Sequence, residues 1–144
     1  MGRQAADLDD MRDIAQVAAK AAMGFFRGRL GVEFKADESP VTQADRGVEA
    51  KVRRLIADRF EGHGLYGEEH GVEGADADAL WVIDPIDGTR SFISGNPLFG
   101  FLLAHLEGGK TRLAAVGMPA LDEVFCAERG KGAFMGAQRL AASG

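Results

Sequence analysis

The chain has 144 residues and a net charge of −5, from 22 acidic and 17 basic side chains. A chain of this length fits one domain and buries roughly 68% of the surface of its unfolded state, so it can form a hydrophobic core. The excess of acids argues against nucleic-acid binding, which would need a basic face, and makes several acids candidates for metal binding.

Two amphipathic helices are predicted in the first part of the chain. The first has an acidic start and ends before Gly31, and the second is predicted to begin at Thr42 and to end at Gly62. Apolar residues at helical spacing define them: Leu8, Met11, Ala15, Ala18, Ala22 and Phe25 in the first, and Val48, Val52, Leu55, Ile56 and Phe60 in the second. Between them, Val32 and Phe34 predict a short strand, and residues 37–40 a turn or loop.

Asp45 follows Thr42 by three residues, which is the spacing of a capping box. On this pattern alone, Asp45 is an acid of the first helical turn that pairs with backbone N–H groups.

Most of the remaining chain is predicted to form strands. Residues 71–79 are small and acidic, which is typical of an exposed loop, and a short helix and turn are predicted within residues 91–97. The predicted strands cover residues 65–67, 80–83, 99–106, 113–118 and 123–128, with a further strand around Phe134 and a turn at 135–137. Antiparallel hairpins are the natural connections, and no linker or repeat divides the chain, so we expect one domain over residues 1–144.

A pair of acids follows the most apolar of these strands. Asp84 and Asp87 are three residues apart and repel each other unless a cation neutralises them, and Mg²⁺ prefers such oxygen ligands. Gly88 permits a sharp backbone turn, and the amides near Thr89 are then placed to face an anion at the start of a short helix. The same residues also fit an Asp-rich turn without a bound ion.

The histidines and the cysteine offer no competing site. His63, His70 and His105 are too scattered for a histidine metal cluster, and we interpret each as a surface or packing residue. Cys126 cannot form an internal disulfide and is interpreted as a small core residue, which suits a reducing cytoplasm. The first residues do not resemble a signal peptide, and no stretch has the length and apolar character of a membrane span. We therefore expect a cytoplasmic location and no membrane partner.

The stretch from Asp84 to Thr89 resembles the signature of the inositol monophosphatase family of Mg²⁺-dependent phosphatases. Gly67-Glu68-Glu69 lies upstream, as the second acidic motif of that family does. Residues 39–45 and 129–134 are similar to two further family segments in the same order, so the resemblance covers nearly the whole chain. Residues 89–100 are most similar to the histidinol-phosphatase branch.

The resemblance implies an α+β fold, with two helices packed on a mainly antiparallel sheet, as the amino-terminal half of the layered family fold. It also implies a set of Mg²⁺ ligands. Glu68, Asp84 and the carbonyl of Ile86 would hold one ion, and Asp84 and Asp87 would help to hold a second.

The resemblance further implies the roles of the residues around the metals. Thr89, oriented by Asp45, would position and deprotonate the attacking water, and the amides of Gly88 and Thr89 would bind the phosphate. The expected activity is the hydrolysis of a small phosphorylated metabolite, either histidinol phosphate or inositol monophosphate, with sugar phosphates and nucleotides as further options.

One departure from the family bears on activity. Family members are about twice this length, and their second half carries a further metal-binding aspartate in a Trp-Asp motif that is absent here. We therefore expect an amino-terminal metal-binding and catalytic domain that is weakly active alone and has one sheet face open to form a homodimer. Two alternatives remain: a non-catalytic module that binds metal or another subunit, and a structural domain whose acids are turn residues.

Overall fold

The computed structural model describes residues 5–26 and 40–143, without the side chains of residues 40–42. The strand expected at Val32 and Phe34 and the loop expected before Pro40 lie outside the described residues. In the described ranges, no helix combines the length and the apolar character that crossing a membrane requires.

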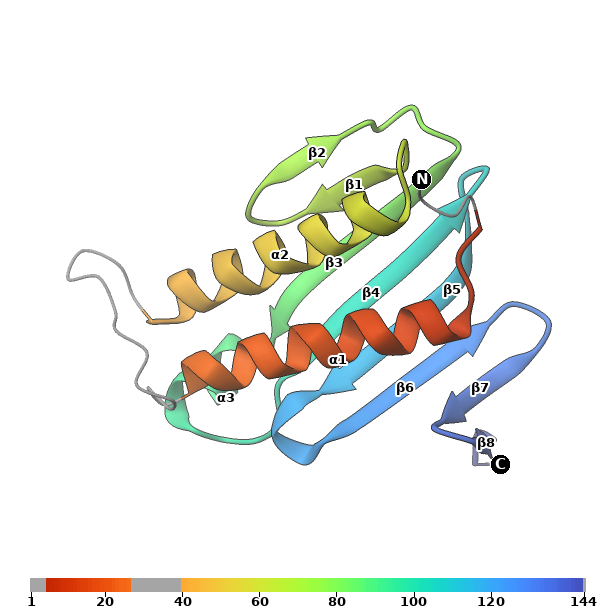
Figure 1. Cartoon of the computed structure of the whole chain (residues 1–144). Helices are drawn as coiled ribbons and strands as arrows, with labels where there is room; N and C mark the ends of the chain where they lie inside the picture. Colours follow the sequence, from red (N-terminus) through yellow and green to blue (C-terminus); the bar gives the residue numbers. More distant parts are fainter. Residues whose placement is uncertain (1–4, 27–39, 144) are drawn as a thin grey trace.

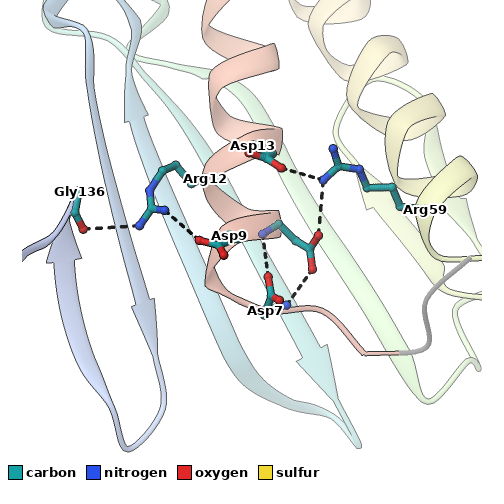
Figure 2. A network of polar contacts seen from close by, with 7 residues as sticks. Asp7, Asp9, Arg12, Asp13, Arg59 and Gly136 are labelled. Carbon is teal, nitrogen blue, oxygen red and sulfur yellow. Dashed lines mark hydrogen bonds and ion pairs between the residues drawn. The ribbon is translucent and has the colours of Figure 1, made fainter.

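Both long helices are present: α1 spans Leu8–Phe25 and α2 spans Pro40–Arg59. Asp7 caps α1, because its carboxylate accepts the N–H of Asp10 at 2.9 Å while the Asp10 carboxylate accepts the N–H of Asp7 at 2.9 Å. Figure 2 shows this capping box and the guanidinium of Arg59, which reaches from α2 to Asp13 and Asp10 on α1. These contacts fix the start of α1 against the end of α2.

Eight strands form one sheet in the order β2-β1-β3-β4-β5-β6-β7-β8. Only β1 and β3 pair in parallel among the described strands, so the sheet is mainly antiparallel, as predicted. The strands are β1 (Gly64–Gly67), β2 (Gly71–Glu73), β3 (Ala79–Asp87), β4 (Gly100–Glu107), β5 (Lys110–Met118), β6 (Glu123–Glu128), β7 (Gly132–Met135) and β8 (Gln138–Leu140). A short helix, α3 (Thr89–Ser94), follows β3, and a 3₁₀ turn, η2 (Pro119–Leu121), joins β5 to β6.

The two long helices lie side by side on one face of the sheet (Figure 1). α1 packs on β4, β5 and β6, and α2 packs on β3. Alternate strand residues point at the helices and are buried with the apolar faces of α1 and α2. The largest members of this core are Met11, Ile14, Ile56, Phe60, Trp81, Ile83, Phe99, Phe101 and Leu113. Cys126 is buried in the same core, as expected.

No described helix packs over the opposite face of the sheet at its centre (Figure 1). Cross-strand partners on this face run from Val82 through Ala104 to Ala114, and from Leu102 through Val116 to Phe125. Val116 is 36% exposed and its partners are half-buried. An apolar strip therefore remains accessible, as the sequence led us to expect.

Two features of the sheet differ from the prediction. Residues 71–79 are not only a loop, because residues 71–73 form β2, which pairs with β1 as a hairpin. All three β2 residues are exposed, so no apolar alternation marked the strand. The parallel pairing of β1 and β3 was not predicted either.

The two buried or half-buried histidines are packing residues. His105 is fully buried against Trp81, with ring centroids 4.2 Å apart, and the indole N–H of Trp81 donates to Nδ1 of His63 at 3.0 Å. His70 is exposed at the turn after β1.

Candidate active site

The sequence pattern predicted that β3 ends just before Asp84-Pro85, and this prediction was wrong. β3 continues to Asp87, because the fixed φ of proline is compatible with an extended chain. Pro85 has no N–H for the ladder, and the register changes there: Asp84 pairs with Leu102, and the next pair joins Asp87 to Gly100. Between these two pairs the chain advances three residues on β3 but only two on β4, which is typical of a β-bulge. The bulge redirects the chain between the two aspartates.

Parallel pairing brings Glu68 to the same edge of the sheet. β1 and β3 run in the same direction, with Gly67 opposite Ile83. The next residues along the chain are Glu68 and Asp84, so these two acids directly follow paired residues of neighbouring strands at the same edge of the sheet. The side chain of Glu68 is exposed and that of Asp84 is half-buried.

Gly88 makes the turn from β3 into α3. Its φ of 88° lies in the left-handed region, and a Cβ at this position would lie 3.2 Å from the carbonyl oxygen of Leu98. α3 then begins at Thr89, and the carbonyl of Gly88 accepts the N–H of Phe92 at 3.0 Å. The side chain of Thr89 is exposed at the start of this helix.

Asp45 belongs to the second turn of α2 and not to its first turn, because the helix begins at Pro40. Proline favours the first helical position, where its missing N–H removes no hydrogen bond. The capping-box interpretation of Thr42 and Asp45 was therefore wrong. α2 contacts α3, so the elements that carry Asp45 and Thr89 are neighbours. The hydrogen bond expected between these two side chains stays a prediction.

The charges of acids on these separate elements act on one another. Burial, followed by the charges of Glu69, Asp84, Glu68 and Glu49, raises the pKa of Asp45 to about 7. We call Asp45, Glu68, Glu69 and Asp84 the acidic site.

The pKa of Asp84 is also raised. Burial, followed by the charges of Glu68 and Asp87, raises its pKa to about 6, although a backbone hydrogen bond involving Ile86 acts in the opposite sense. Both shifts mean that the folded chain disfavours the ionised carboxylates as they stand.

The acidic site fits a hard divalent cation. Oδ1 of Asp84 is buried and has no hydrogen-bond partner within the described part of the chain, so a lone pair is left without a donor. A cation would satisfy that oxygen and would reduce the repulsion that raises both pKa values. The described residues contain no preformed group of three or more acidic, histidine or cysteine side chains at metal-binding separation. The ligand roles of Glu68, Asp84, Asp87 and the Ile86 carbonyl stay predictions.

A hollow of about 410 Å³ borders Glu68 and Asp84 on the open face of the sheet. The rest of its lining is apolar and comes from β1, β3, β4 and β5: Tyr66, Val82, Ile83, Leu102, Leu103, Ala104, Ala114, Ala115 and Val116. A larger hollow of about 630 Å³ lies between α1 and the β6 and β7 region, and its lining includes none of the acidic site. We place the candidate site at the smaller hollow because its lining includes Glu68 and Asp84, and the pKa of Asp84 is raised.

The sequence model of the inositol monophosphatase family matches residues 7–144. The chain belongs to the inositol monophosphatase family. A histidinol-phosphatase of Chlorobaculum parvum is 44% identical over 130 residues, which are 90% of this chain and 50% of that protein. An inositol-1-monophosphatase of Mesorhizobium japonicum is 36% identical over 137 residues, which cover 91% of this chain and 52% of that protein.

Solved structures of the inositol monophosphatase family share the fold. An inositol monophosphatase from Zymomonas mobilis superposes with a TM-score of 0.78 at 36% identity, over 97% of this chain and 55% of that one. These matches confirm the predicted α+β class. The chain spans about half the length of the curated relatives that it matches.

The sequence left the role of one residue near the site open and missed another. Glu69, interpreted from the sequence either as a residue behind the metal ligands or as a solvated one, is the strongest charged neighbour acting on the pKa of Asp45. Glu49 was not considered at all, although it is fully buried. A signal was present: Asp45, Glu49 and Arg53 follow at four-residue spacing, so they share one face of α2.

Proposed function

We propose that residues 1–144 form the amino-terminal metal-binding and catalytic domain of a Mg²⁺-dependent phosphoric monoester hydrolase. The observation that carries this proposal is the buried Oδ1 of Asp84, which lacks a hydrogen-bond partner among the described residues, and the charges of acids from α2, β3 and the turn after β1 raise the pKa values of Asp45 and Asp84. Membership of the inositol monophosphatase family supports it.

Glu68, Asp84, Asp87 and the carbonyl of Ile86 would hold the ions. Bound Mg²⁺ supplies positive charge to the phosphate oxygens and to the leaving alcohol, and it makes a nearby water more acidic. The amides of Gly88 and Thr89 open α3, where the first N–H groups have no acceptor within the helix, and they are placed to donate to a phosphate oxygen.

Thr89 and Asp45 would move the proton. The Thr89 hydroxyl would accept a proton from the attacking water and donate its own to Asp45, while the water oxygen bonds to phosphorus and the ester P–O bond breaks. The leaving oxygen takes a proton from solvent and departs as the alcohol. Bound Mg²⁺ would lower the pKa of Asp45 from about 7, so its carboxylate would be ionised near neutral pH and able to accept the proton from Thr89. No covalent phospho-enzyme is needed.

For the substrate, we propose histidinol phosphate. Residues 89–100 carry the resemblance to that branch, and a histidinol-phosphatase is 44% identical to this chain. Inositol monophosphate is the second candidate, because an inositol-1-monophosphatase is 36% identical. Cys126 is free and buried, which suits the reducing cytoplasm proposed for the protein.

A non-catalytic, metal-binding module is the alternative function, because about half of each relative has no counterpart in these residues. A phosphate-release assay separates the two. It compares histidinol phosphate, inositol monophosphate and a nucleotide 3′-phosphate, with and without Mg²⁺, on the chain alone and on the chain joined to the unmatched half of a relative. We expect weak turnover alone, strong turnover when joined, and a preference for histidinol phosphate.

Asp84→Asn should abolish the Mg²⁺-dependent turnover, whereas Asp76→Asn makes the same charge change on an exposed loop and should not. Failure of the joined chain to release phosphate from any ester would contradict the hydrolase and favour the non-catalytic module. A clear preference for inositol monophosphate or the nucleotide would contradict only the choice of substrate.

A further inference from the structure

One buried carboxylate on α2 holds the turn that carries Glu68. The side chain of Glu49 is fully buried. Its Oε1 accepts the backbone N–H of Glu69 at 3.0 Å, and its Oε2 accepts the backbone N–H of His70 at 2.8 Å. These amides belong to residues 68–70, which we call the acidic turn and which join β1 to β2.

Further contacts extend this attachment along the hairpin. Nε of Arg53 donates to Oε2 of Glu49 at 3.1 Å, and its terminal nitrogens donate to the carbonyl of Gly71 and to Glu73, the latter at 3.2 Å. The His70 ring lies 3.2 Å from the carbonyl oxygen of Arg46. α2 therefore holds the acidic turn through Glu49 and the start of β2 through Arg53, one helical turn further on.

Gly67 shows how closely the Glu49 carboxylate approaches the Gly67-Glu68-Glu69 motif. A Cβ on Gly67 would lie 2.3 Å from Cδ of Glu49 and within 2.5 Å of both carboxylate oxygens. The φ of Gly67 is not positive, so its backbone conformation does not demand glycine. Glycine is required there because the space of a side chain is taken by the carboxylate of Glu49.

Glu49 itself is poorly placed to be a metal ligand, although it lies near Asp45. Both of its oxygens already accept hydrogen bonds, and Arg53 neutralises its charge. Its position on α2, one turn after Asp45, instead links two parts of the site. The helix that carries Asp45 also holds the turn that carries Glu68.

We propose that Glu49 is a positioning residue for the metal site: by holding the amides of Glu69 and His70, it sets where Glu68 stands relative to Asp45 and Asp84. This inference rests on the proposed function and adds a residue to it. Because outer contacts of metal ligands are worth about 10–100-fold in metal affinity, the effect is measurable without catalysis.

The test follows backbone amides of the ¹⁵N-labelled 144-residue chain by NMR, first in hydrogen exchange without metal and then in a Mg²⁺ titration. Glu49→Gln preserves the size of the side chain but places an NH₂ group where an acceptor is needed, so at least one contact is lost. We expect the Glu69 and His70 amides to exchange about tenfold faster or more, and Mg²⁺ affinity to fall about tenfold or more, in a variant that is fully folded at the temperature used.

Gly67→Ala is an independent variant, because it displaces the carboxylate of Glu49 without changing any charge. It should reproduce both effects, and it decides the question if Glu49→Gln does not fold. Glu73→Gln is the matched control: it removes an exposed partner of Arg53 but touches neither amide. Its amide exchange and Mg²⁺ affinity should stay within about twofold of the unsubstituted chain, as for a surface substitution.

Unchanged Mg²⁺ affinity in folded Glu49→Gln would overturn the positioning role, even if the melting temperature fell. Unchanged exchange at Glu69 and His70 would overturn the anchoring that the role depends on. If the unsubstituted chain binds no Mg²⁺, the proposed function and the positioning role both fail. Mg²⁺ binding by the unsubstituted chain therefore distinguishes the two failures. If that chain binds Mg²⁺ and folded Glu49→Gln binds it equally well, only the positioning role fails.

Discussion

Two groups of acidic side chains border the helices of this chain, and their charges are compensated very differently. At the start of α1, Asp10 is 1% exposed, yet its carboxylate accepts the N–H of Asp7 and pairs with Arg59 (Figure 2). In the acidic site, the pKa values of Asp45 and Asp84 are raised, and Oδ1 of Asp84 has no partner in the described residues.

The comparison teaches that burial of an acid does not by itself mark a functional site. A buried carboxylate with donors and an opposite charge is part of the fold, as at Asp10. A carboxylate such as that of Asp84, with one buried oxygen that lacks a donor in the described residues and with other acids acting on it, stores a repulsion that a bound cation can relieve. We expect substitutions in the two groups to have opposite effects on stability, and only those in the acidic site to affect chemistry.

The largest effect is expected in catalysis. In a chain that turns over phosphate esters, alone or joined to the unmatched half of a relative, Asp45→Asn and Thr89→Ala should lower kcat about 10²–10⁴-fold, the usual contribution of a positioned proton acceptor. Mg²⁺ affinity should change far less, because neither residue is a proposed ligand. Steady-state kinetics and a Mg²⁺ titration give the two numbers, and unchanged kcat in both variants would remove the pair from the mechanism.

Breaking the compensated group should destabilise the fold. Asp10→Ala removes a buried acceptor and leaves the N–H of Asp7 and the Arg59 guanidinium without it, which should cost about 1–3 kcal/mol of unfolding free energy. Urea denaturation measures this loss. Asp9→Ala is the matched control, because its side chain is 83% exposed and should matter by about 0.5 kcal/mol or less. Equal losses in the two variants would show that the buried contacts of Asp10 do not stabilise the fold.

Neutralising a carboxylate of the acidic site should stabilise the metal-free fold. At pH 8 without metal, Asp84→Asn removes a repelled charge and should raise the unfolding free energy by about 1 kcal/mol, a figure reduced for solvent screening because the group is partly exposed. The same substitution should weaken Mg²⁺ binding. A less stable Asp84→Asn chain at pH 8 would contradict the idea of stored repulsion.

The repulsion also predicts how stability depends on pH. Folding raises the pKa of Asp45 from its ordinary value of 3.8 to about 7, and that of Asp84 from 3.8 to about 6. Between about pH 4 and 7 the folded chain therefore holds protons that the unfolded chain has released, and these two groups make the metal-free chain less stable as pH rises through that window. In thermal unfolding across this range, the stability of Asp45→Asn should fall less with rising pH than that of the unsubstituted chain. An identical pH profile for variant and unsubstituted chain would assign the decline to other groups.

The smallest effect is expected on the open face of the sheet. We propose that this apolar strip supports weak homodimer formation at high concentration. Val116→Lys should raise the dimer dissociation constant by roughly tenfold or less in sedimentation experiments. Ile93→Lys, which changes an exposed residue on α3 that is not part of the apolar strip, should not raise it. A chain that stays monomeric at all concentrations would exclude the dimer.

Local patterns predicted most of the fold because they act over short distances. A continuous apolar run bounded by Glu123 and Glu128 places β6 at Glu123–Glu128, and the paired glycines after Glu107 give the β4–β5 hairpin. Two elements depended on distant partners. All three residues of β2 are exposed, and this strand exists through its pairing with β1, while the parallel pairing of β1 with β3 joins segments separated by a loop.

The residues in and around the acidic site divide in the same way. Asp84 and Asp87 stand together in the sequence, whereas the approach of Glu68 depends on the parallel register of Gly67 with Ile83. Glu49 escaped notice because an acid on an amphipathic helix usually faces solvent. Its burial becomes evident only when the acidic turn is folded back onto α2.

The most direct test of the central claim counts the protons released when Mg²⁺ binds. Calorimetric titrations of the 144-residue chain at pH 6, in two buffers of different ionisation enthalpy, give that number. Because Asp45 has a pKa of about 7 and Asp84 of about 6 before binding, Mg²⁺ should release about one proton at pH 6 and almost none at pH 8. Binding without proton release at pH 6, or no binding at millimolar Mg²⁺, would contradict a cation site built from these uncompensated carboxylates.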